Sequence, residues 1–246
     1  MKLFVIIICL LSERYLIHTL SSKRQIWFNQ LFDQIKLKAS WDNPYLLLSA
    51  FMLPLISILA LVLWFLGDAL FGLVELLVNI IIFYFSLGPT NPFYPESVDK
   101  GELIHGGNAG YYLNSVHNQL FAVIILYILL GPIAALSYRL LSFSQNKETI
   151  AALAQHLVAL IDWLLVRVTA LLYLLAGNFQ QGFNTYCKMI KAVTRDNALF
   201  LSTIGILAAQ TQPDKPVLMV QAQDLVEHAL VILMVILSLL TLVACL

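Results

Sequence analysis

Residues 157–177 read LVALIDWLLVRVTALLYLLAG, an apolar run that carries two ionisable side chains, Asp162 and Arg167. An apolar helix of about 20 residues is long enough to cross the hydrocarbon core of a bilayer. A charge at that depth costs at least about 2.5–3.5 kcal/mol, so an ionisable residue there marks a functional site by default. This one segment therefore predicts both a membrane fold and a candidate site.

The composition of the whole chain agrees with a membrane protein. Of 246 residues, 60% are hydrophobic and 11% are charged, with a mean hydropathy of +0.85. Soluble domains are about 45–50% apolar and about 25% charged. We predict an all-α, polytopic integral membrane bundle in contact with the lipid bilayer, as a single domain over residues 1–246. The formal net charge of zero argues against a nucleic-acid partner.

The apolar runs predict five membrane-spanning helices, and two further features qualify this pattern. Gly131-Pro132 falls inside the third span and predicts a kink. The N-terminal run Leu3–Leu11 is too short to span alone, and it is expected to be the half-buried part of a helix reaching about Leu20, at a depth left open. No small-x-small cleavage site follows this run, so it is interpreted as retained. The five predicted spans are residues 44–66, 69–87, 120–141, 157–176 and 229–246.

The distribution of Lys and Arg predicts the orientation of these spans. If residues 157–176 span, the segments 12–43, 88–119 and 177–228 share one side and carry ten Lys and Arg, against two on the other side. If that helix does not span, the two sides carry six and seven. The larger bias predicts that the three segments are cytoplasmic. Lys23–Lys38 is amphipathic, and it either lies on the membrane surface or packs on the spans.

Several common chemistries have no motif in this chain. There is no Walker-type phosphate loop, no dinucleotide-binding glycine pattern, no nucleophile elbow and no H-E-x-x-H pair. The five histidines show no metal-ligand spacing, and the three cysteines form no C-x-x-C pair. We expect neither a cofactor nor a metal, although an enzyme of unusual type is still possible.

Four groups of polar residues remain as candidates for a site. Asp162 and Arg167 are five residues apart, so they point about 140° away from each other on one helix. Each is expected to take a partner of opposite charge from another helix. The arrangement is either a set of interhelical ion pairs that fixes packing, or a polar cavity that opens to the cytoplasm and holds a charged ligand. The candidate residues are Glu13, Arg14, Glu75, Asn79, Glu102, His105, Arg139, Asp162 and Arg167.

Two of these groups have simpler interpretations as well. Glu75 and Asn79 lie four residues apart on one helix face, where they form a packing hydrogen bond or face the same cavity. Glu102 and His105 belong to the glycine-rich stretch 101–110, whose backbone N–H groups either bind an anion or only form a turn.

The order of four motifs resembles a known family. Residues 160–167, LIDWLLVR, resemble the D-W-x-P-V-R segment of the AmpE and CobD/CbiB membrane proteins, with Leu165 in place of the usual proline. Residues 130–141, LGPIAALSYRLL, resemble their G-P-x-x-A-L-x-Y-R-L span. Glu13-Arg14 is similar to the L-L-x-E-R start of AmpE, and residues 101–106, GELIHG, to its connecting loop.

Two functions follow from this resemblance. AmpE implies a sensor or regulator of the bacterial inner membrane, linked to β-lactamase induction and cell-wall recycling, with a cell-wall-derived ligand or a membrane protein as its partner. CobD/CbiB implies a synthase that joins an aminopropanol unit to a corrinoid carboxylate with ATP, but its G-D-P…P-H-P, G-R-D-T and E-N-T-x-D-G motifs are not found here. We therefore expect a non-catalytic regulator, with the synthase as the alternative. A small-solute transporter is a third class, without an obvious inverted repeat in its favour.

The resemblance also implies where the site lies. Glu13, Arg14, Arg139, Asp162 and Arg167 are expected to frame one polar pocket inside the helical bundle.

Overall fold

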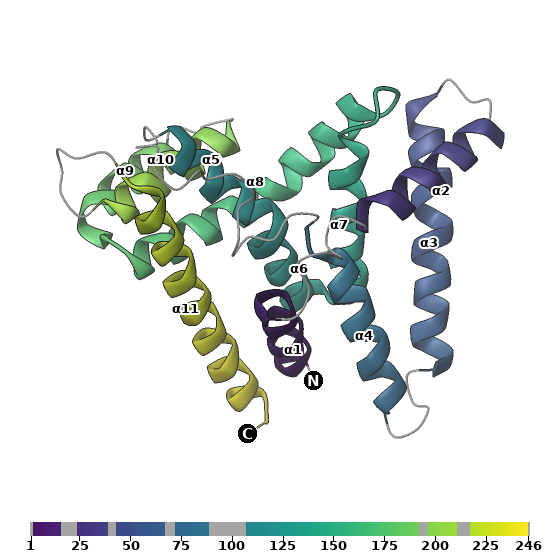
Figure 1. Ribbon diagram of the computed structural model, residues 1–246, viewed down its shortest axis with the longest axis horizontal. Helices are drawn as coiled ribbons and strands as arrows, with labels where there is room; N and C mark the ends of the chain where they lie inside the picture. Colours follow the sequence, from purple (N-terminus) through teal and green to yellow (C-terminus); the bar gives the residue numbers. More distant parts are fainter. Residues whose placement is uncertain are drawn as a thin grey trace. The chain divides into compact units, whose positions relative to one another are not determined.

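The computed structural model describes residues 2–15, 24–38, 43–66, 72–88, 107–191, 196–210 and 217–245. These residues form helices, and no strand occurs among them, which confirms the all-α prediction (Figure 1). The elements are α1 (Lys2–Tyr15), α2 (Arg24–Lys38), α3 (Pro44–Leu66), α4 (Leu73–Ser86), α5 (Gly107–Val116), η2 (His117–Phe121), α6 (Ala122–Leu130), α7 (Pro132–Ser144), α8 (Ala151–Ala176), α9 (Phe179–Lys191), α10 (Asn197–Ala209) and α11 (Met219–Cys245).

The chain divides into two compact units. The first unit comprises residues Met1–Asn91 and Val123–Ile161, and the second comprises Pro92–Ala122 and Asp162–Leu246. The chain passes between the units at residues 91–92, 122–123 and 161–162, and the last two positions lie within continuous helices. Helix α8 thus contributes residues to both units.

In the first unit, α3, α4 and α7 run side by side and α1 packs on α4 (Figure 1). Cys9 Sγ donates a hydrogen bond to the Ile80 carbonyl at 3.7 Å, which joins α1 to α4. Phe83 of α4 meets Tyr127 of α6 edge to face, with ring centroids 4.8 Å apart. These contacts occur on apolar helices, so packing rather than backbone preference holds the unit together.

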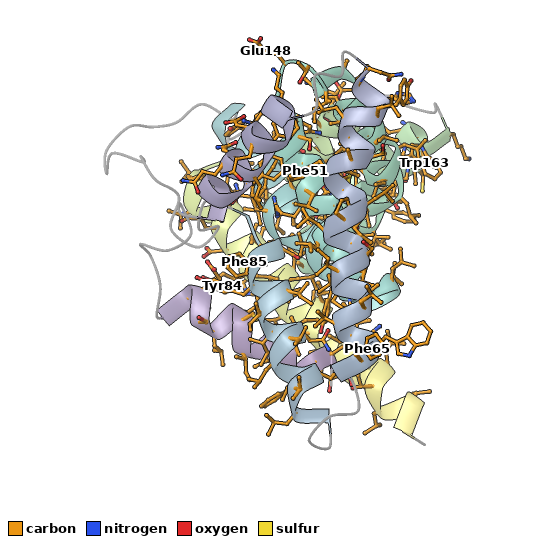
Figure 2. The ribbon with its side chains drawn as sticks, turned by 90° about the vertical axis from the view of Figure 1, so that its right-hand side faces the viewer. Phe51, Phe65, Tyr84, Phe85, Glu148 and Trp163 are labelled. Atoms are coloured by element: carbon orange, nitrogen blue, oxygen red, sulfur yellow. The ribbon has the colours of Figure 1, made fainter. Side chains whose placement is uncertain are left out.

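Helix α2 packs on α3 and α7 through aromatic side chains. Phe28 lies 5.0 Å from Phe51 of α3 and 5.2 Å from Phe143 of α7 between ring centroids, and Phe32 lies 5.7 Å from Phe51. The side chains of Phe28 and Phe32 are buried. Figure 2 shows Phe51 near one end of α3 and Phe65 near the other end. Of the two interpretations of Lys23–Lys38, these contacts support packing on the spans.

The expected third span, residues 120–141, is two helices instead of one kinked helix. Helix α6 ends at Leu130, Gly131 adopts φ 90° and ψ −172°, and α7 begins at Pro132. This backbone conformation is open almost only to glycine. Proline at the first position of α7 needs no hydrogen-bond acceptor for a backbone N–H, so it starts a helix well. The apolar helix before the break instead begins at Gly107, inside the segment expected to be a polar connection.

In the second unit, α10 packs against α5, α9 and α11. Glycine allows the close approach of α5 and α10, because a Cβ atom added at Gly205 would lie 2.7 Å from Leu113 Cδ1. A Cβ atom added at Gly110 would lie 3.0 Å from Ser202 Cβ. Tyr173 of α8 lies in the core of this unit, where its hydroxyl donates to the Leu113 carbonyl at 3.2 Å.

Four helical segments of the described chain are long and apolar enough to cross a membrane. They are Pro44–Phe65, Ala109–Leu130, Ala151–Ala176 and Met219–Val243. Large apolar side chains such as Trp64 and Phe65 are 83% and 79% exposed, as expected for contact with lipid. These helices indicate a membrane protein. The predicted span 69–87 is not among them, because α4 has 14 residues and is about 21 Å long.

One contact conflicts with the predicted sidedness. Lys147 Nζ, in the turn between α7 and α8, lies 2.9 Å from Asp33 Oδ1 of α2. The prediction placed residues 12–43 on one side of the membrane and this turn on the other. Two side chains in direct contact cannot lie on opposite sides of a bilayer about 30 Å thick. In Figure 2, Glu148, which follows Lys147, lies at the end of the unit opposite Phe65.

Candidate functional site

Asp162 and Arg167 both lie inside the second unit and are withdrawn from solvent. Their relative exposures are 8% and 7%. Both belong to α8, which is one of the candidate membrane spans. Five helical residues separate them, so they contact different neighbours on two sides of the helix. As expected, each meets residues from another helix, but the neighbours differ from those predicted.

On one side of α8, Asp162 faces a histidine that also contacts a threonine. Asp162 Oδ1 lies 3.9 Å from His117 Nε2, and His117 Nδ1 lies 2.9 Å from Thr169 Oγ1. Asp162 and Thr169 are seven residues apart, two helical turns on one face, so a side chain from a neighbouring helix fits between them. His117 and Thr169 are 1% and 0% exposed. We call these three residues the His117 array.

Only one of the two contacts of His117 is a hydrogen bond. The contact with Thr169 is within hydrogen-bond distance, whereas 3.9 Å is too long for one with Asp162. His117 Nε2 is buried and has no hydrogen-bond partner among the described residues. The array therefore places a carboxylate oxygen 3.9 Å from a buried imidazole nitrogen that has no hydrogen-bond partner among the described residues.

A local irregularity of the helix positions His117. Residues 117–121 form the π-helical turn η2 between α5 and α6, with backbone dihedrals at both flanking residues in the normal helical range. Such turns interrupt α-helices mostly at functional sites, because the wider turn redirects the side chains that follow. His117 lies in segment 88–119, which was predicted to be a connection between spans, and it was not predicted as a site residue. The signal that was available is a histidine near the middle of a segment apolar enough to span, Ala109–Leu130.

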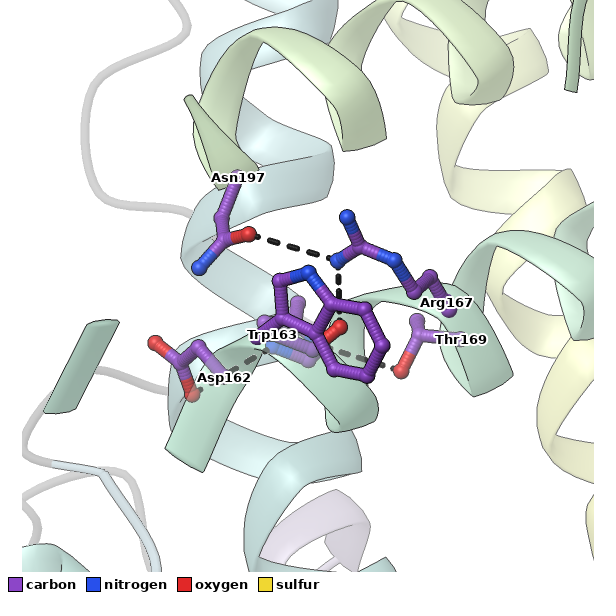
Figure 3. Close-up of polar contacts among 6 residues, drawn as sticks. Asp162, Trp163, Arg167, Thr169 and Asn197 are labelled. Carbon is purple, nitrogen blue, oxygen red and sulfur yellow. Dashed lines mark hydrogen bonds and ion pairs between the residues drawn. The ribbon is translucent and has the colours of Figure 1, made fainter. Parts of the chain in front are cut away.

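On the other side of α8, Arg167 lies among aromatic and amide groups instead of carboxylates. Its guanidinium carbon lies 4.3 Å from the Trp163 ring centroid and 5.1 Å from that of Phe200. Nη1 donates to the Trp163 carbonyl and to Asn197 Oδ1, the latter at 3.4 Å (Figure 3). We call Trp163, Arg167, Tyr186, Asn197 and Phe200 the Arg167 cluster.

The electrostatic balance of this cluster is incomplete. No acidic side chain among residues 107–191, 196–210 and 217–245 lies within 4 Å of the Arg167 guanidinium. Its Nε is buried and has no hydrogen-bond partner in the described part of the chain. Cation–π contacts stabilise a guanidinium by about 0.5–2 kcal/mol, which is small beside the cost of burying a charge. The described residues therefore leave the charge of Arg167 without an opposite charge beside it and its Nε without an acceptor.

Tyr186 of α9 closes the cluster beyond the end of α8. Its hydroxyl donates to the Arg167 carbonyl at 3.3 Å, and its ring meets Phe200 edge to face at 5.6 Å. Burial raises the pKa of Tyr186 above its ordinary value of 10.0, while the nearby Arg167 charge acts in the opposite direction. Tyr186 is therefore a neutral hydrogen-bond donor at physiological pH, and it adds no negative charge to balance the arginine.

The other residues of the predicted five-residue pocket lie in the first unit. Glu13 and Arg139 are each 2% exposed, and Arg14 is exposed. Arg139 Nε donates to the Ser86 carbonyl at the end of α4, at 2.6 Å, and its guanidinium carbon lies 5.6 Å from the Phe143 ring. Arg139 therefore binds the terminus of a neighbouring helix, a structural role within its own unit.

The remaining predicted residues have different outcomes. Glu75 is exposed and Asn79 is buried, and Asn79 Oδ1 has no hydrogen-bond partner among the described residues. The expected packing hydrogen bond between these two residues is thus absent from the described structure. Glu102 and His105 lie outside the described residues.

Sequence reasoning missed the neighbours that the fold brings to Asp162 and Arg167. His117 and Thr169 complete the array, and Trp163, Tyr186, Asn197 and Phe200 complete the cluster.

Within the described residues, no group of three His, Cys, Asp or Glu side chains is arranged to hold a metal ion. Models of known protein families, curated proteins and solved structures were compared with the chain, and none of them matches it.

Proposed function

We propose that this protein is an AmpE-like regulator of the bacterial inner membrane that binds an anionic ligand, or an acidic group of a membrane partner, at Arg167. The observation that carries the proposal is a guanidinium buried in a candidate membrane span, with its Nε lacking a hydrogen-bond partner and no carboxylate within 4 Å in the described part of the chain. A charge in that position is costly unless something pairs with it. A ligand carboxylate or phosphate supplies that pair, since a guanidinium binds such groups through two parallel hydrogen bonds.

The chemistry of the cluster favours binding over catalysis. Arg167 has no accessible protonation change, and its aromatic neighbours are chemically inert. The residues that surround it hold the guanidinium in place through ring contacts and two hydrogen bonds. Cell-wall fragments carry carboxylates, so the family resemblance and the charge of the site point to the same class of ligand. Ligand binding at Arg167 would then bias how α8 contacts α9 and α10.

A genetic test addresses the regulatory role. A deletion strain is complemented with the wild-type gene, with Arg167→Gln, or with Lys188→Gln, which removes an exposed cation of α9 outside the cluster. β-Lactamase activity is measured after exposure to an inducing β-lactam, together with the amount of protein in the membrane fraction. We expect deletion to change induction, and wild type and Lys188→Gln to restore it. Arg167→Gln should insert at a comparable level and fail to restore it.

Two results would count against the proposal. Unchanged induction after deletion would remove the regulatory role. Full complementation by Arg167→Gln would show that the guanidinium is needed for neither binding nor signalling. If this variant were lost from the membrane fraction, Arg167 would instead be a residue that helix packing requires.

A further inference from the structure

The second unit contains a cleft that shares no residue with the His117 array or the Arg167 cluster. It has a volume of about 420 Å³ and is open to the surface. The ends of α8 and α10 form one side of the cleft, and the first turns of α11 form another. Its lining residues are Ala176, Gly177, Asn178, Ala208, Ala209, Gln210, Gln221, Asp224, Leu225 and His228.

A close backbone contact fixes the shape of this cleft. The backbone N–H of Asn178 donates to the Ala208 carbonyl at 2.8 Å, which ties the end of α8 to the end of α10. A Cβ atom at Gly177 would lie 2.2 Å from the Ala208 carbonyl oxygen and 2.7 Å from Leu225 Cδ1. Glycine at position 177 is therefore required for α8, α10 and α11 to meet here, and the cleft is a built feature of the fold.

The cleft presents hydrogen-bond acceptors and one negative side-chain charge. Helices α8 and α10 both end at it, and each helix C-terminus presents backbone carbonyls and the negative end of its dipole, whereas the first turns of α11 present the positive end of a third dipole. Asp224 adds an exposed carboxylate from α11, whose full charge outweighs that partial positive charge. Among the described lining residues there is no Lys or Arg, and no basic side chain of the described chain pairs with Asp224.

His228 adds a further acceptor in its neutral form. Its Nδ1 lies 2.7 Å from the Asp224 backbone carbonyl, which has no hydrogen to donate, so Nδ1–H must be the donor. In the neutral ring Nε2 then carries the lone pair. A ligand for this site needs several N–H donors and a positive charge.

The position of the cleft along the helices further restricts the kinds of ligand that can reach it. Helix α8, a candidate span, ends at Ala176, and the uninterrupted apolar part of α11 begins at Ala229, one residue after His228. The cleft therefore lies where two candidate spans reach the polar face of a bilayer. We propose that it binds a primary ammonium group, carried by an ethanolamine lipid headgroup or by a small soluble amine. The –NH₃⁺ group supplies three donors and one positive charge, and the volume suits a small ligand.

Two variants and one matched control test this assignment. Asp224→Asn removes the charge with little change in shape, and Asp224→Lys places an ammonium in the cleft itself. Glu227→Gln removes another carboxylate of α11 that does not line the cleft. The full chain is reconstituted in phosphatidylcholine nanodiscs and titrated with putrescine by calorimetry. In parallel, discs with equal phosphatidylethanolamine and phosphatidylcholine are analysed for retained lipid by native mass spectrometry.

We expect saturable binding of putrescine, or preferential retention of phosphatidylethanolamine. Putrescine binding identifies a soluble amine as the source, and retention of the lipid alone identifies the headgroup. Asp224→Asn should weaken either by about tenfold or more, since a charge-assisted hydrogen bond of this kind contributes that much. Asp224→Lys should abolish binding, and Glu227→Gln should bind like wild type.

Two outcomes would overturn the assignment. One is the absence of putrescine binding together with equal retention of the two lipids, because phosphatidylcholine carries no N–H donor. The other is binding that survives both Asp224 substitutions. Since neither measurement involves Arg167 or β-lactamase induction, the cleft and the regulatory proposal can fail separately.

Discussion

At the scale of single residues, burial of polar groups is the feature that organises the second unit. His117 and Thr169 are almost fully buried, and one hydrogen bond joins His117 Nδ1 to Thr169 Oγ1. A buried polar group that loses its partner costs about 1–3 kcal/mol, more than the bond itself contributes when formed. The His117 array is therefore sensitive to changes that leave its shape intact.

The first residue-scale prediction concerns the hydroxyl of Thr169. Thr169→Val keeps the shape of the side chain and removes the partner of His117 Nδ1. We expect the free energy of unfolding to fall by about 1–3 kcal/mol. Thr169→Ser keeps the hydroxyl and should lose less. The measurement is unfolding in mixed detergent and denaturant micelles, followed by circular dichroism. Equal stability of the valine variant and wild type would show that the bond has no energetic role.

The second residue-scale prediction concerns the pH dependence that Tyr186 confers. Its pKa in the folded protein lies above 10.0, the value expected when the chain unfolds. Below pH 10 both the folded and the unfolded chain keep the Tyr186 proton, and the contribution of this tyrosine to the free energy of unfolding is fully present. As the pH rises from 10 through the folded pKa, the unfolded state loses its proton first, so the contribution is lost.

Unfolding between pH 8 and pH 11 tests this sign. Tyr186→Phe should flatten the fall in stability above pH 10 relative to wild type. Tyr45→Phe, at a tyrosine that is 68% exposed, controls for the removal of a hydroxyl. A steeper fall in Tyr186→Phe than in wild type would contradict the direction of the pKa shift.

At the scale of helices, sequence predicted the uniformly apolar helices better than those that contain polar residues. The run Pro44–Leu66 became a helix with the predicted bounds, because it is uniformly apolar and ends at a glycine. Helix α5 was missed because Asn108 and Asn114 resemble loop residues in a linear sequence. The cost of placing Asn114 in a helix is lowered by the hydrogen bond from its Nδ2 to the Ala198 carbonyl, which no local pattern contains.

The element-scale prediction concerns the break at Gly131. A Cβ atom added there meets nothing within 4 Å, so any cost of Gly131→Ala comes from the backbone alone. A residue other than glycine at φ 90° and ψ −172° is strained by about 1–3 kcal/mol. We expect the variant to lose that much unfolding free energy. Pro132→Ala should change stability less, since its missing N–H needs no partner at the start of a helix. No difference between the two variants would show that proline, not glycine, sets the break.

At the scale of the whole molecule, the sequence predicted the class of protein, while contacts between distant segments changed its expected topology. The composition of the chain and the length of its apolar runs are enough to predict an all-α membrane protein. The buried positions of Asp162 and Arg167 also followed from the sequence, since they lie within one apolar run. Their neighbours did not, because His117 and Asn197 are 45 and 30 residues away along the chain and only the tertiary fold brings them close.

The sides on which loops lie are a further whole-molecule property, and the Asp33–Lys147 contact gives an arrangement that differs from the predicted one. The 2.9 Å contact places residues 33 and 147 on the same side of a bilayer. The five-span arrangement places them on opposite sides.

Single-cysteine labelling distinguishes the two arrangements. In a chain whose native cysteines are replaced by serine, cysteine is introduced at Gln34, at Glu148 or at Asn184, each of which is exposed. A membrane-impermeant maleimide is applied to intact spheroplasts and to inverted vesicles. The Asp33–Lys147 contact places positions 34 and 148 on one side, since they flank it, and a crossing by α8 places position 184 on the other. The first two should therefore react in the same preparation and the third in the opposite one. Reaction of positions 34 and 148 in different preparations would show instead that α4 crosses despite its length and that the contact does not form in the bilayer.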